Sequence, residues 1–548
     1  MDVKKAIQEA LSEALQKCGV ATEPHDVPLE FPAELSHGDY ASGVALKEAK
    51  AAGMNPRALA EKVVADIGAI EGVSKIEIAG PGFINFHLSP QAVADSLKTA
   101  STADMWGANS DLAGKKIMVE YTDPNPFKEF HIGHLMSNAI GESISRLLQF
   151  SGAEIKRANY QGDVGPHVAK AMWGKMQKPE LPWGEAYALG SKEYEANKED
   201  IDAINAHVYA RDDEKINELY DAGRKESLEH FEELYKILGT KFDFYFFESE
   251  TALKGLALVG AHSDIFEKSD GAVVYKGEQD GLHTRVFITS KGLPTYETKE
   301  LGLAELKNET WPSDISITVT AQEQADYFAV VLAAMKKVFP EIAAKIRHIS
   351  HGMMRLTTGK MSSRTGDVIT GESLLNDLID QAKIRAAESR AADHDQLAQD
   401  VAVAAIKYQI LKQASGKDII FEKERALSLE GDSGPYLQYA HARTRAILEK
   451  AKEQGVEAKI EDTATPNELS RSLRRFPEIV ERAAEHYEPH ILTTYLLEVA
   501  SAFNSWYAQE QILDGTPAAA NKVALTAVVS RTLKNGLWIL GIPAPEKM

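Results

Sequence analysis

The 548-residue chain carries 81 acidic and 61 basic side chains, which gives a formal net charge of -20. This balance argues against general nucleic-acid binding, although a local basic surface would still allow the protein to bind one folded RNA. A single cysteine, Cys18, excludes an intramolecular disulfide and any zinc site built from several cysteines. No apolar run is long enough to cross a bilayer, and the first twenty residues lack the apolar core of a signal peptide, so we expect a cytoplasmic protein of several domains.

The first part of the chain, residues 1–108, is predicted to be a small α/β domain. Apolar residues four apart predict a helix over residues 1–18. Residues 36–67 predict two helices divided by Gly53 and Pro56. Residues 73–89 alternate between apolar and polar side chains around a glycine-proline-glycine turn, which predicts a pair of short strands.

The segment 115–152 contains the most informative pattern in the chain. A strand over residues 117–121 must end before the two prolines that follow it, and apolar residues recur at helical spacing from 136 to 148. His131, Gly133 and His134 then lie at a helix N-terminus, where unpaired N–H groups and the helix dipole favour an anion. Two imidazoles there can donate hydrogen bonds to phosphate, whereas an isolated pair at this spacing can also bind a metal or simply satisfy each other.

A parallel sheet follows from the order of elements. A second strand is predicted over residues 155–160, followed by a glycine turn around Asp163, and the order strand, helix, strand indicates a Rossmann-type sheet with ligands at the carboxyl ends of its strands. Residues from about 176 to 250 are helical and heavily charged, which we interpret as a solvated insertion without assigned chemistry. Runs rich in β-branched and aromatic residues at 242–249, 272–277 and 285–292 predict that the sheet resumes there.

Two motifs resemble those of one enzyme family. The sequence PNPFKEFHIGH at residues 124–134 resembles the HIGH signature of class I aminoacyl-tRNA synthetases, and its Pro124, Asn125 and Lys128 resemble the arginyl branch. Downstream, KMSSR at residues 360–364 is similar to the family's KMSKS loop. The segments GDYAS, GPGFINF and YLQYAHAR resemble the terminal domains of arginyl-tRNA synthetases.

This resemblance implies three parts. They are an N-terminal additional domain that contacts tRNA (1–108), a Rossmann-type catalytic domain (109–433) and an all-α anticodon-binding domain (434–548). The catalytic domain would include the insertion at about 176–250 and a helical connection at about 372–433.

The resemblance also implies a reaction used in translation. ATP would activate L-arginine to arginyl-adenylate, and the arginyl group would pass to the 3′-terminal ribose of tRNA(Arg) with release of AMP and pyrophosphate. Mg²⁺ would accompany ATP, no zinc is expected, and the protein would be a monomer. The resemblance assigns catalysis to Lys128, His131, His134 and Lys360. It assigns ATP binding to His131, Gly133, His134, Met354, Lys360, Met361, Ser362 and Ser363.

The family's arginine-binding positions correspond to Glu120, Asn125, Asp163, His167, Tyr296, Glu300 and Gln324. Glu300 stands where the family has Asp, so Tyr296 ranks above it as a direct contact, and Gln322 is a competing register for Gln324. An isolated glutamate at a strand end is more often a surface residue. Glu120 is a candidate for arginine binding only because it lies beside the motif PNPFKEFHIGH.

The C-terminal region offers candidate tRNA contacts. The main candidates are Arg443 and Arg445, and Arg471, Arg474 and Arg475 are further candidate contacts to phosphate. Most of these arginines could equally be ordinary surface charges. Trp506, Tyr507 and Trp538 can stack on unpaired bases, but aromatic residues in a helical domain more often belong to the core.

Three alternatives remain at this stage. The chain can be another class I synthetase, such as a glutamyl, cysteinyl or class I lysyl enzyme, or a nucleotidyltransferase with HIGH-like chemistry. It can also be a synthetase-derived RNA-binding regulator. The division of labour between Lys128 and Lys360 is open as well.

Overall fold

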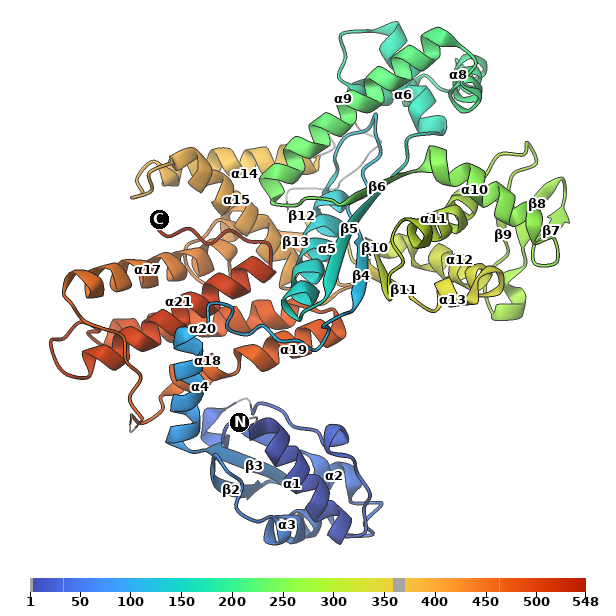
Figure 1. The fold of residues 1–548 in the computed structure, drawn as a ribbon. Coiled ribbons are helices and arrows are strands. Elements are labelled where there is room, and N and C mark those ends of the chain that lie inside the picture. The colour runs from blue at the N-terminus through green and yellow to red at the C-terminus, as the bar shows by residue number, and fades with distance from the viewer. Residues whose placement is uncertain (1–2, 33, 358–369, 463) are drawn as a thin grey trace. The chain divides into compact units, whose positions relative to one another are not determined.

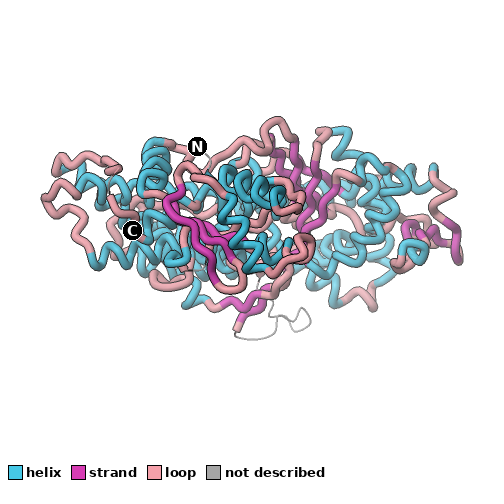
Figure 2. Tube along the Cα trace, turned by 90° about the horizontal axis from the view of Figure 1, so that it is seen from below, coloured by secondary structure: helices cyan, strands magenta, loops and turns pink. Residues whose placement is uncertain are grey.

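The computed structural model describes residues 3–32, 34–357, 370–462 and 464–548 (Figure 1). The chain divides into two compact units. The first contains Met1–Trp106, Arg443–Pro477 and Glu498–Thr532, and the second contains Gly107–Ala442, Glu478–Leu497 and Leu533–Met548. Strands form separate groups among the helices that make up most of the chain (Figure 2).

The second unit is built on a five-stranded parallel sheet in the order β11-β10-β4-β5-β6. Its strands in chain order are β4 (Lys116–Glu120), β5 (Glu154–Gln161), β6 (Phe244–Phe247), β10 (Ile315–Ala321) and β11 (Ile346–His351). The predicted Rossmann-type parallel sheet is therefore confirmed. Because all five strands run the same way, their carboxyl ends meet at one edge, which is where a ligand binds in such folds.

Helix α5 (Ile132–Phe150) packs along one face of this sheet (Figure 1). Its contact with β4 is close, since a Cβ added at Gly141 would lie 2.2 Å from Cγ of Tyr121. Met118 of β4 points to the opposite face and packs there with Leu303 of α11 (Tyr296–Thr310). Met118 in β4 and Tyr121 directly after it are three positions apart, so they pack against helices on opposite sides of the sheet.

One prediction about the sheet is wrong. The runs at 272–277 and 285–292 do not extend the parallel sheet but form a separate antiparallel sheet of β7 (Glu267–Ser269), β8 (Ala272–Tyr275) and β9 (Arg285–Ile288). Asp270 and Gly271 both have positive φ, 48° and 80°, and make the two-residue turn between β7 and β8. Such a turn joins antiparallel neighbours, whereas parallel neighbours need a long crossover.

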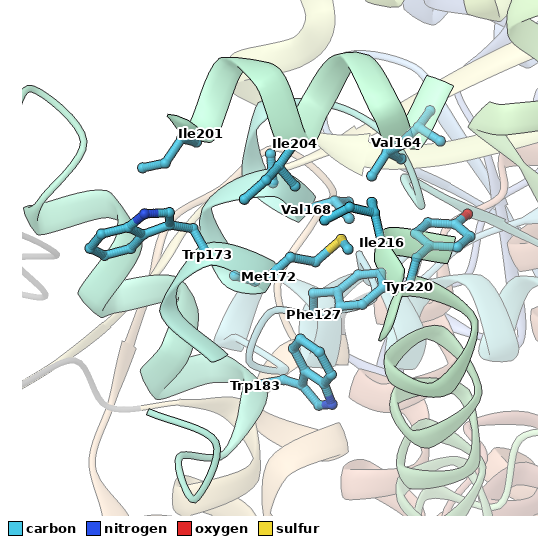
Figure 3. Packing of buried hydrophobic residues seen from close by; sticks show 13 residues of the cluster. Phe127, Val164, Val168, Met172, Trp173, Trp183, Ile201, Ile204, Ile216 and Tyr220 are labelled. Atoms are coloured by element: carbon cyan, nitrogen blue, oxygen red, sulfur yellow. The ribbon is translucent and has the colours of Figure 1, made fainter. Parts of the chain in front are cut away.

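The charged region between β5 and β6 is helical, as expected, but it is more than a solvated insertion. Its helices are α6 (Pro166–Gln177), α7 (Trp183–Lys192), α8 (Lys198–Ala210) and α9 (Glu214–Leu238). They enclose an apolar cluster that includes Trp183, Ile204 and Tyr220, and Phe127 from the loop after β4 inserts into it (Figure 3). The charges cover the outer faces, so the sequence conceals this core.

Further helices surround the sheet in the second unit. They include α10 (Glu248–Ala261), α12 (Ala325–Val338), α14 (Gly371–Ala386) and α15 (His394–Leu411). A short parallel pair, β12 (Met354–Leu356) and β13 (Ile419–Phe421), lies outside the main sheet. Lys407 of α15 is fully buried, and its Nζ donates to the carbonyls of Leu238 (2.7 Å) and Gly541 (3.0 Å). This lysine therefore joins three parts of the unit.

The first unit contains the N-terminal domain. Helix α1 (Val3–Lys17) buries Ile7, Leu11 and Leu15, which confirms its predicted apolar stripe. The predicted strand pair is present as β2 (Val73–Ala79) and β3 (Phe83–Leu88). Within the stretch expected to be two helices, residues 40–42 instead form β1 (Tyr40–Ser42) beside β3, followed by α2 (Val44–Glu48) and α3 (Pro56–Asp66).

The other α-helices of the described residues are mostly C-terminal. They are α4 (Pro90–Thr102), α13 (Pro340–Ala343), α16 (Lys423–Ala426), α17 (Gly434–Glu453), α18 (Glu468–Arg474), α19 (Phe476–His486), α20 (Pro489–Gln509) and α21 (Ala519–Ile539). None of the helices within the described ranges is both long and apolar enough to span a membrane.

Candidate active site

The histidine pair lies at the start of α5, as the sequence predicted. His131 is the N-cap residue, its backbone N–H donates to Nδ1 of His134 (3.1 Å), and the two rings stack with centroids 3.4 Å apart. Nδ1 of His134 is an acceptor, so its proton is on Nε2, which remains a donor. Burial lowers the pKa of His131 to about 4 and that of His134 well below 6.5, so both rings are neutral at pH 7.

Lys128 supplies the nearby positive charge. Its Nζ lies 4.9 Å from the centroid of the Tyr187 ring, a cation–π contact with α7. Its charge helps to lower the pKa values of His131 and His167, after the larger effect of burial. Met354, which was predicted to bind ATP, is buried at the start of β12. The other predicted residues of the signature loop, Lys360, Met361, Ser362 and Ser363, lie outside the described residues.

The loop between β4 and α5 has an unusual backbone. Thr122, Asp123 and Phe127 have φ values of 79°, 49° and 69°, a left-handed region that side chains other than glycine rarely adopt. The Asp123 carboxylate accepts a hydrogen bond from the backbone N–H of Tyr160 (2.7 Å), and Ser227 Oγ accepts one from the N–H of Phe127 (3.0 Å). Strain of this kind persists only where the surroundings enforce it, and it concentrates at functional sites.

Three carboxyl groups gather where β4 ends. Glu120 is buried and forms an ion pair with Lys307 of α11. Glu300 lies on the same helix, its Oε1 accepts from the hydroxyl of Tyr327 (2.9 Å), and burial together with the charge of Glu120 raises its pKa to about 8. The same two causes raise the pKa of Asp123 well above its usual range. Lys307 supplies one positive charge against these three carboxyl groups, so the cluster favours a further cationic group.

The glycine turn after β5 is fixed from several sides. Asp163 is completely buried and accepts hydrogen bonds from Ser249, through its N–H (2.9 Å) and its hydroxyl (2.8 Å), and from the hydroxyl of Tyr220 (3.0 Å). Arg224 completes the set as an ion pair, with Nε 3.1 Å from the carboxylate. Asp163 is thus surrounded by protein groups.

The turn also contacts two other predicted arginine-binding residues. Asn125 Oδ1 accepts a hydrogen bond from the N–H of Gly162 (3.0 Å). His167 Nε2 lies 2.8 Å from the carbonyl of Gly162, and burial lowers the pKa of His167 to about 3. Since that imidazole is neutral and Nε2 faces an acceptor, Nε2 carries the proton. Asn125, the turn and His167 therefore form one connected unit.

Helix α11 presents two of the predicted residues one turn apart. Tyr296 is 62% exposed at the start of the helix, and Glu300 follows on the same face, as the spacing predicted. Gln324 and its rival Gln322 are both exposed in the short helix before α12, and their geometry does not decide between them. The structure thus brings the main sequence-predicted residues to the carboxyl edge of the sheet.

Sequence reasoning missed several residues of this site. Lys299 of α11 forms a buried ion pair with Glu248 (2.5 Å), and its Nζ lies 5.4 Å from the centroid of the Tyr296 ring. Lys307 was missed too, although it stands seven residues after Glu300 and therefore two turns along the same helix face. In the described part of the chain, no group of three or more His, Cys, Asp and Glu side chains is arranged to hold a metal.

The arginines proposed as tRNA contacts all lie in the first unit. Arg443 hydrogen-bonds Asn504, and its guanidinium carbon lies 5.2 Å from the centroid of the Tyr507 ring. Arg471 forms an ion pair with Asp39. Three others are placed as follows: Arg474 donates to the hydroxyl of Tyr40 (2.7 Å), Arg475 lies 4.6 Å above the ring of Phe31, and Arg445 is half-buried on α17. Of the aromatic candidates, Tyr507 and Trp538 are 42% and 37% exposed.

Three family models match successive parts of the chain. They are the arginyl tRNA synthetase N terminal domain (residues 2–88), the catalytic domain of class I (R) tRNA synthetases (103–423) and the DALR anticodon binding domain (437–548). The second match identifies the sheet and its histidine-bearing helix as a class I tRNA synthetase catalytic domain.

Relatives agree along the whole chain. Proteins named arginine--tRNA ligase from Treponema denticola and Limosilactobacillus reuteri are each 32% identical, with full coverage of both chains. The solved structure of arginyl-tRNA synthetase from Thermus thermophilus superposes with a TM-score of 0.84 at 26% identity over the full length of both chains. That of Plasmodium falciparum gives 0.79 at 22% identity, over 100% of this chain and 99% of the other, which supports the fold. The chain belongs to the arginyl-tRNA synthetase family.

Proposed function

We propose that the protein is an arginine--tRNA ligase. It activates L-arginine with ATP to arginyl-adenylate, then transfers the arginyl group to the 3′-terminal ribose of tRNA(Arg), and it works in the cytoplasm as a monomer. The observation that supports this proposal is an acidic cluster of Glu120, Asp123 and Glu300 where β4 ends, followed across one loop by the histidine-bearing N-terminus of α5. One end of this edge suits a cationic side chain and the other suits phosphate.

The first step needs alignment and charge stabilisation. The arginine carboxylate attacks the α-phosphorus of ATP, the bond to the β-phosphate oxygen breaks, and pyrophosphate leaves. The neutral rings of His131 and His134 can each donate one hydrogen bond to phosphate oxygens, and Lys128 and Lys360 add positive charge. Removing one preorganised donor of this kind raises a barrier by about 2.7–4 kcal/mol. Mg²⁺ would accompany ATP, held mainly through the phosphates.

The second step needs no covalent enzyme intermediate. A ribose hydroxyl at the 3′ end of tRNA attacks the carbonyl carbon of the mixed anhydride, loses its proton, and displaces AMP. Arg443 and Arg445 are the proposed contacts to tRNA. An Arg443→Ala/Arg445→Ala variant should raise KM for tRNA and leave KM for arginine unchanged.

Specificity for arginine follows from the acidic cluster. A guanidinium is planar and offers five donors that carboxylates accept in pairs, whereas lysine offers only a compact ammonium. Glu120 and Glu300 come from different elements, β4 and α11, and can accept donors from different sides of a planar group. Tyr296, Asn125 and Gln324 are the proposed additional arginine contacts. Analogues that leave the carboxyl groups of Glu120 and Glu300 unpaired should be rejected strongly.

The test is aminoacylation of tRNA with arginine by the unmodified protein and by two single variants. Lys128→Ala should lower the rate by about 100-fold or more, since it removes a charge that acts on the transferring phosphoryl group. Lys192→Ala, an exposed lysine of α7, is the matched control and should charge normally. A protein that binds tRNA but charges none would instead be the RNA-binding regulator.

A further inference from the structure

Helix α9 of the charged insertion directly contacts the loop between β4 and α5, which carries Asn125, Phe127 and Lys128. Its Ser227 accepts the hydrogen bond from the backbone N–H of Phe127 (3.0 Å), a residue one hundred positions earlier in the chain. The ring of Phe127 is fully buried, with centroid distances of 5.0 Å to Trp183 of α7 and 5.8 Å to Tyr220 of α9 (Figure 3). The insertion thus holds both the backbone and the side chain of this residue.

Phe127 needs such support. Its φ of 69° is a left-handed conformation that an aromatic residue rarely adopts, and it persists only where neighbouring groups enforce it. The next residue is Lys128, whose ammonium lies over the Tyr187 ring of the same insertion. The backbone conformation of Phe127 therefore determines the position of the Lys128 ammonium group relative to the N-terminus of α5.

The same helix also fixes the glycine turn. Tyr220 and Arg224 of α9 both contact the buried carboxylate of Asp163, at 3.0 Å and 3.1 Å. Asp163 is next to Gly162, whose N–H donates to the side chain of Asn125 (3.0 Å). The packing there is tight, because a Cβ at Gly162 would lie 2.4 Å from Oδ1 of Asn125.

Both connections end on one short loop. Ser227 reaches Phe127 directly, and Tyr220 reaches Asn125 through Asp163 and Gly162. The two routes start seven residues apart on α9, two turns along the same face, so the helix acts on the loop as one rigid support.

We propose that α9 is a positioning element of the active site, in which Ser227 and Tyr220 hold the loop bearing Asn125 and Lys128 in its substrate-binding conformation. This inference rests on the proposed function, since it takes Asn125 as an arginine contact and Lys128 as a phosphate contact. The charged insertion, to which the sequence assigned no chemistry, would then support catalysis by positioning the loop, without contact between its side chains and the substrate.

The test uses two variants that each remove one hydroxyl. Tyr220→Phe keeps the ring and removes only the hydrogen bond to Asp163, and Ser227→Ala removes only the acceptor of Phe127. Tyr194→Phe is the matched control for the first, because its hydroxyl bonds Asp202 (2.9 Å) within the same insertion and away from the loop. For the second the control is Ser191→Ala, whose hydroxyl has no hydrogen-bond partner among the residues that the structure describes.

The measured quantities are KM for arginine, KM for tRNA and kcat in tRNA charging, with thermal unfolding of each variant. Tyr220→Phe should raise KM for arginine about tenfold and leave KM for tRNA unchanged. A misplacement of 1 Å in an active site can cost about 100-fold in rate, so a tenfold effect corresponds to a smaller displacement of the loop. Ser227→Ala should lower kcat by a similar factor, because it releases Lys128, and thermal unfolding should show that the variant is as fully folded at the assay temperature as the unmodified protein; a kcat loss that matches the lost folded fraction would overturn the role of Ser227. Both controls should match the unmodified protein.

A purely structural role would give a different pattern. Loss of folded protein lowers the apparent kcat and leaves every KM unchanged, so that pattern for Tyr220→Phe would overturn the proposal, as would kinetics equal to those of the control. If the unmodified protein itself fails to charge tRNA with arginine, the proposed function fails. If it charges normally and the variants do too, only the role of α9 is refuted.

Discussion

Glu300 must lose its proton before its carboxylate can pair with a guanidinium. Burial and the charge of Glu120 raise its pKa to about 8, Glu248 adds to this effect, and Lys307 and the hydroxyl of Tyr327 partly offset it. At pH 7 the group is therefore mostly protonated in the empty site. We expect the affinity for arginine to rise with pH as this proton becomes easier to remove.

The size of the effect follows from the pKa. For each pH unit below its pKa, removing the proton from Glu300 costs about 1.4 kcal/mol. The affinity for arginine should therefore rise by about tenfold per unit from pH 6 to about 8 and level off at higher pH. The histidines do not contribute, because the pKa values of His131 and His167, about 4 and about 3, lie below this window. Glu300→Gln cannot ionise, so it should bind arginine more weakly at pH 8 and show a smaller slope, because Asp123 is then the cluster's remaining carboxyl group with a strongly raised pKa.

Calorimetric titration with L-arginine at half-unit steps from pH 6 to 8 measures this directly. Glu297→Gln is the matched control, since it makes the same change on α11 at a residue that pairs with Arg285. It should keep the slope of the unmodified protein. A flat profile in the unmodified protein, or an unchanged slope in Glu300→Gln, would refute the reasoning.

Three further predictions concern stability. Gly141→Ala places a methyl group against the Tyr121 ring and should lower the free energy of unfolding by about 1–3 kcal/mol in urea titrations, and no loss would show that α5 packs differently. Gly260→Ala, whose added Cβ meets nothing within 4 Å, should instead gain about 0.4–1 kcal/mol, and a loss would contradict the open space seen there. Burial lowers the pKa of Lys407 to about 7, so between pH 7 and 10.5 the unfolded chain binds more protons and stability should rise with pH. Lys407→Met should lack this rise when urea unfolding is compared at pH 7 and 9.5, and an unchanged slope would assign it to another group.

The strand and helix around the histidine pair could be predicted because several local signals agree there. Two prolines stop the strand, helical spacing runs from Met136 to Leu148, and Gly152 ends the helix. The separate hairpin could not be predicted from its strand-like composition, since alternation shows that a segment is a strand and not which strand it pairs with. The turn residues Asp270 and Gly271 were the available signal.

Of the site residues, only those at positions of the family motifs could be predicted from the sequence. Glu120 and Glu300 were expected, but the lysine that pairs with Glu120 was not, because the one signal for Lys307 was its seven-residue spacing from Glu300 on the same helix and it belongs to neither motif. The contact between Ser227 and Phe127 spans one hundred residues and depends on tertiary packing alone. The charged outer faces of the insertion concealed the apolar faces that make it possible.

The central claim is tested most directly by charging unfractionated tRNA with each of the twenty radiolabelled amino acids in turn, with ATP and Mg²⁺. The account predicts that arginine alone becomes attached, and that attachment requires ATP. Attachment of a different amino acid would contradict the assignment of the acidic cluster while leaving the class I fold intact. No attachment of any amino acid by folded protein would contradict the proposed function itself.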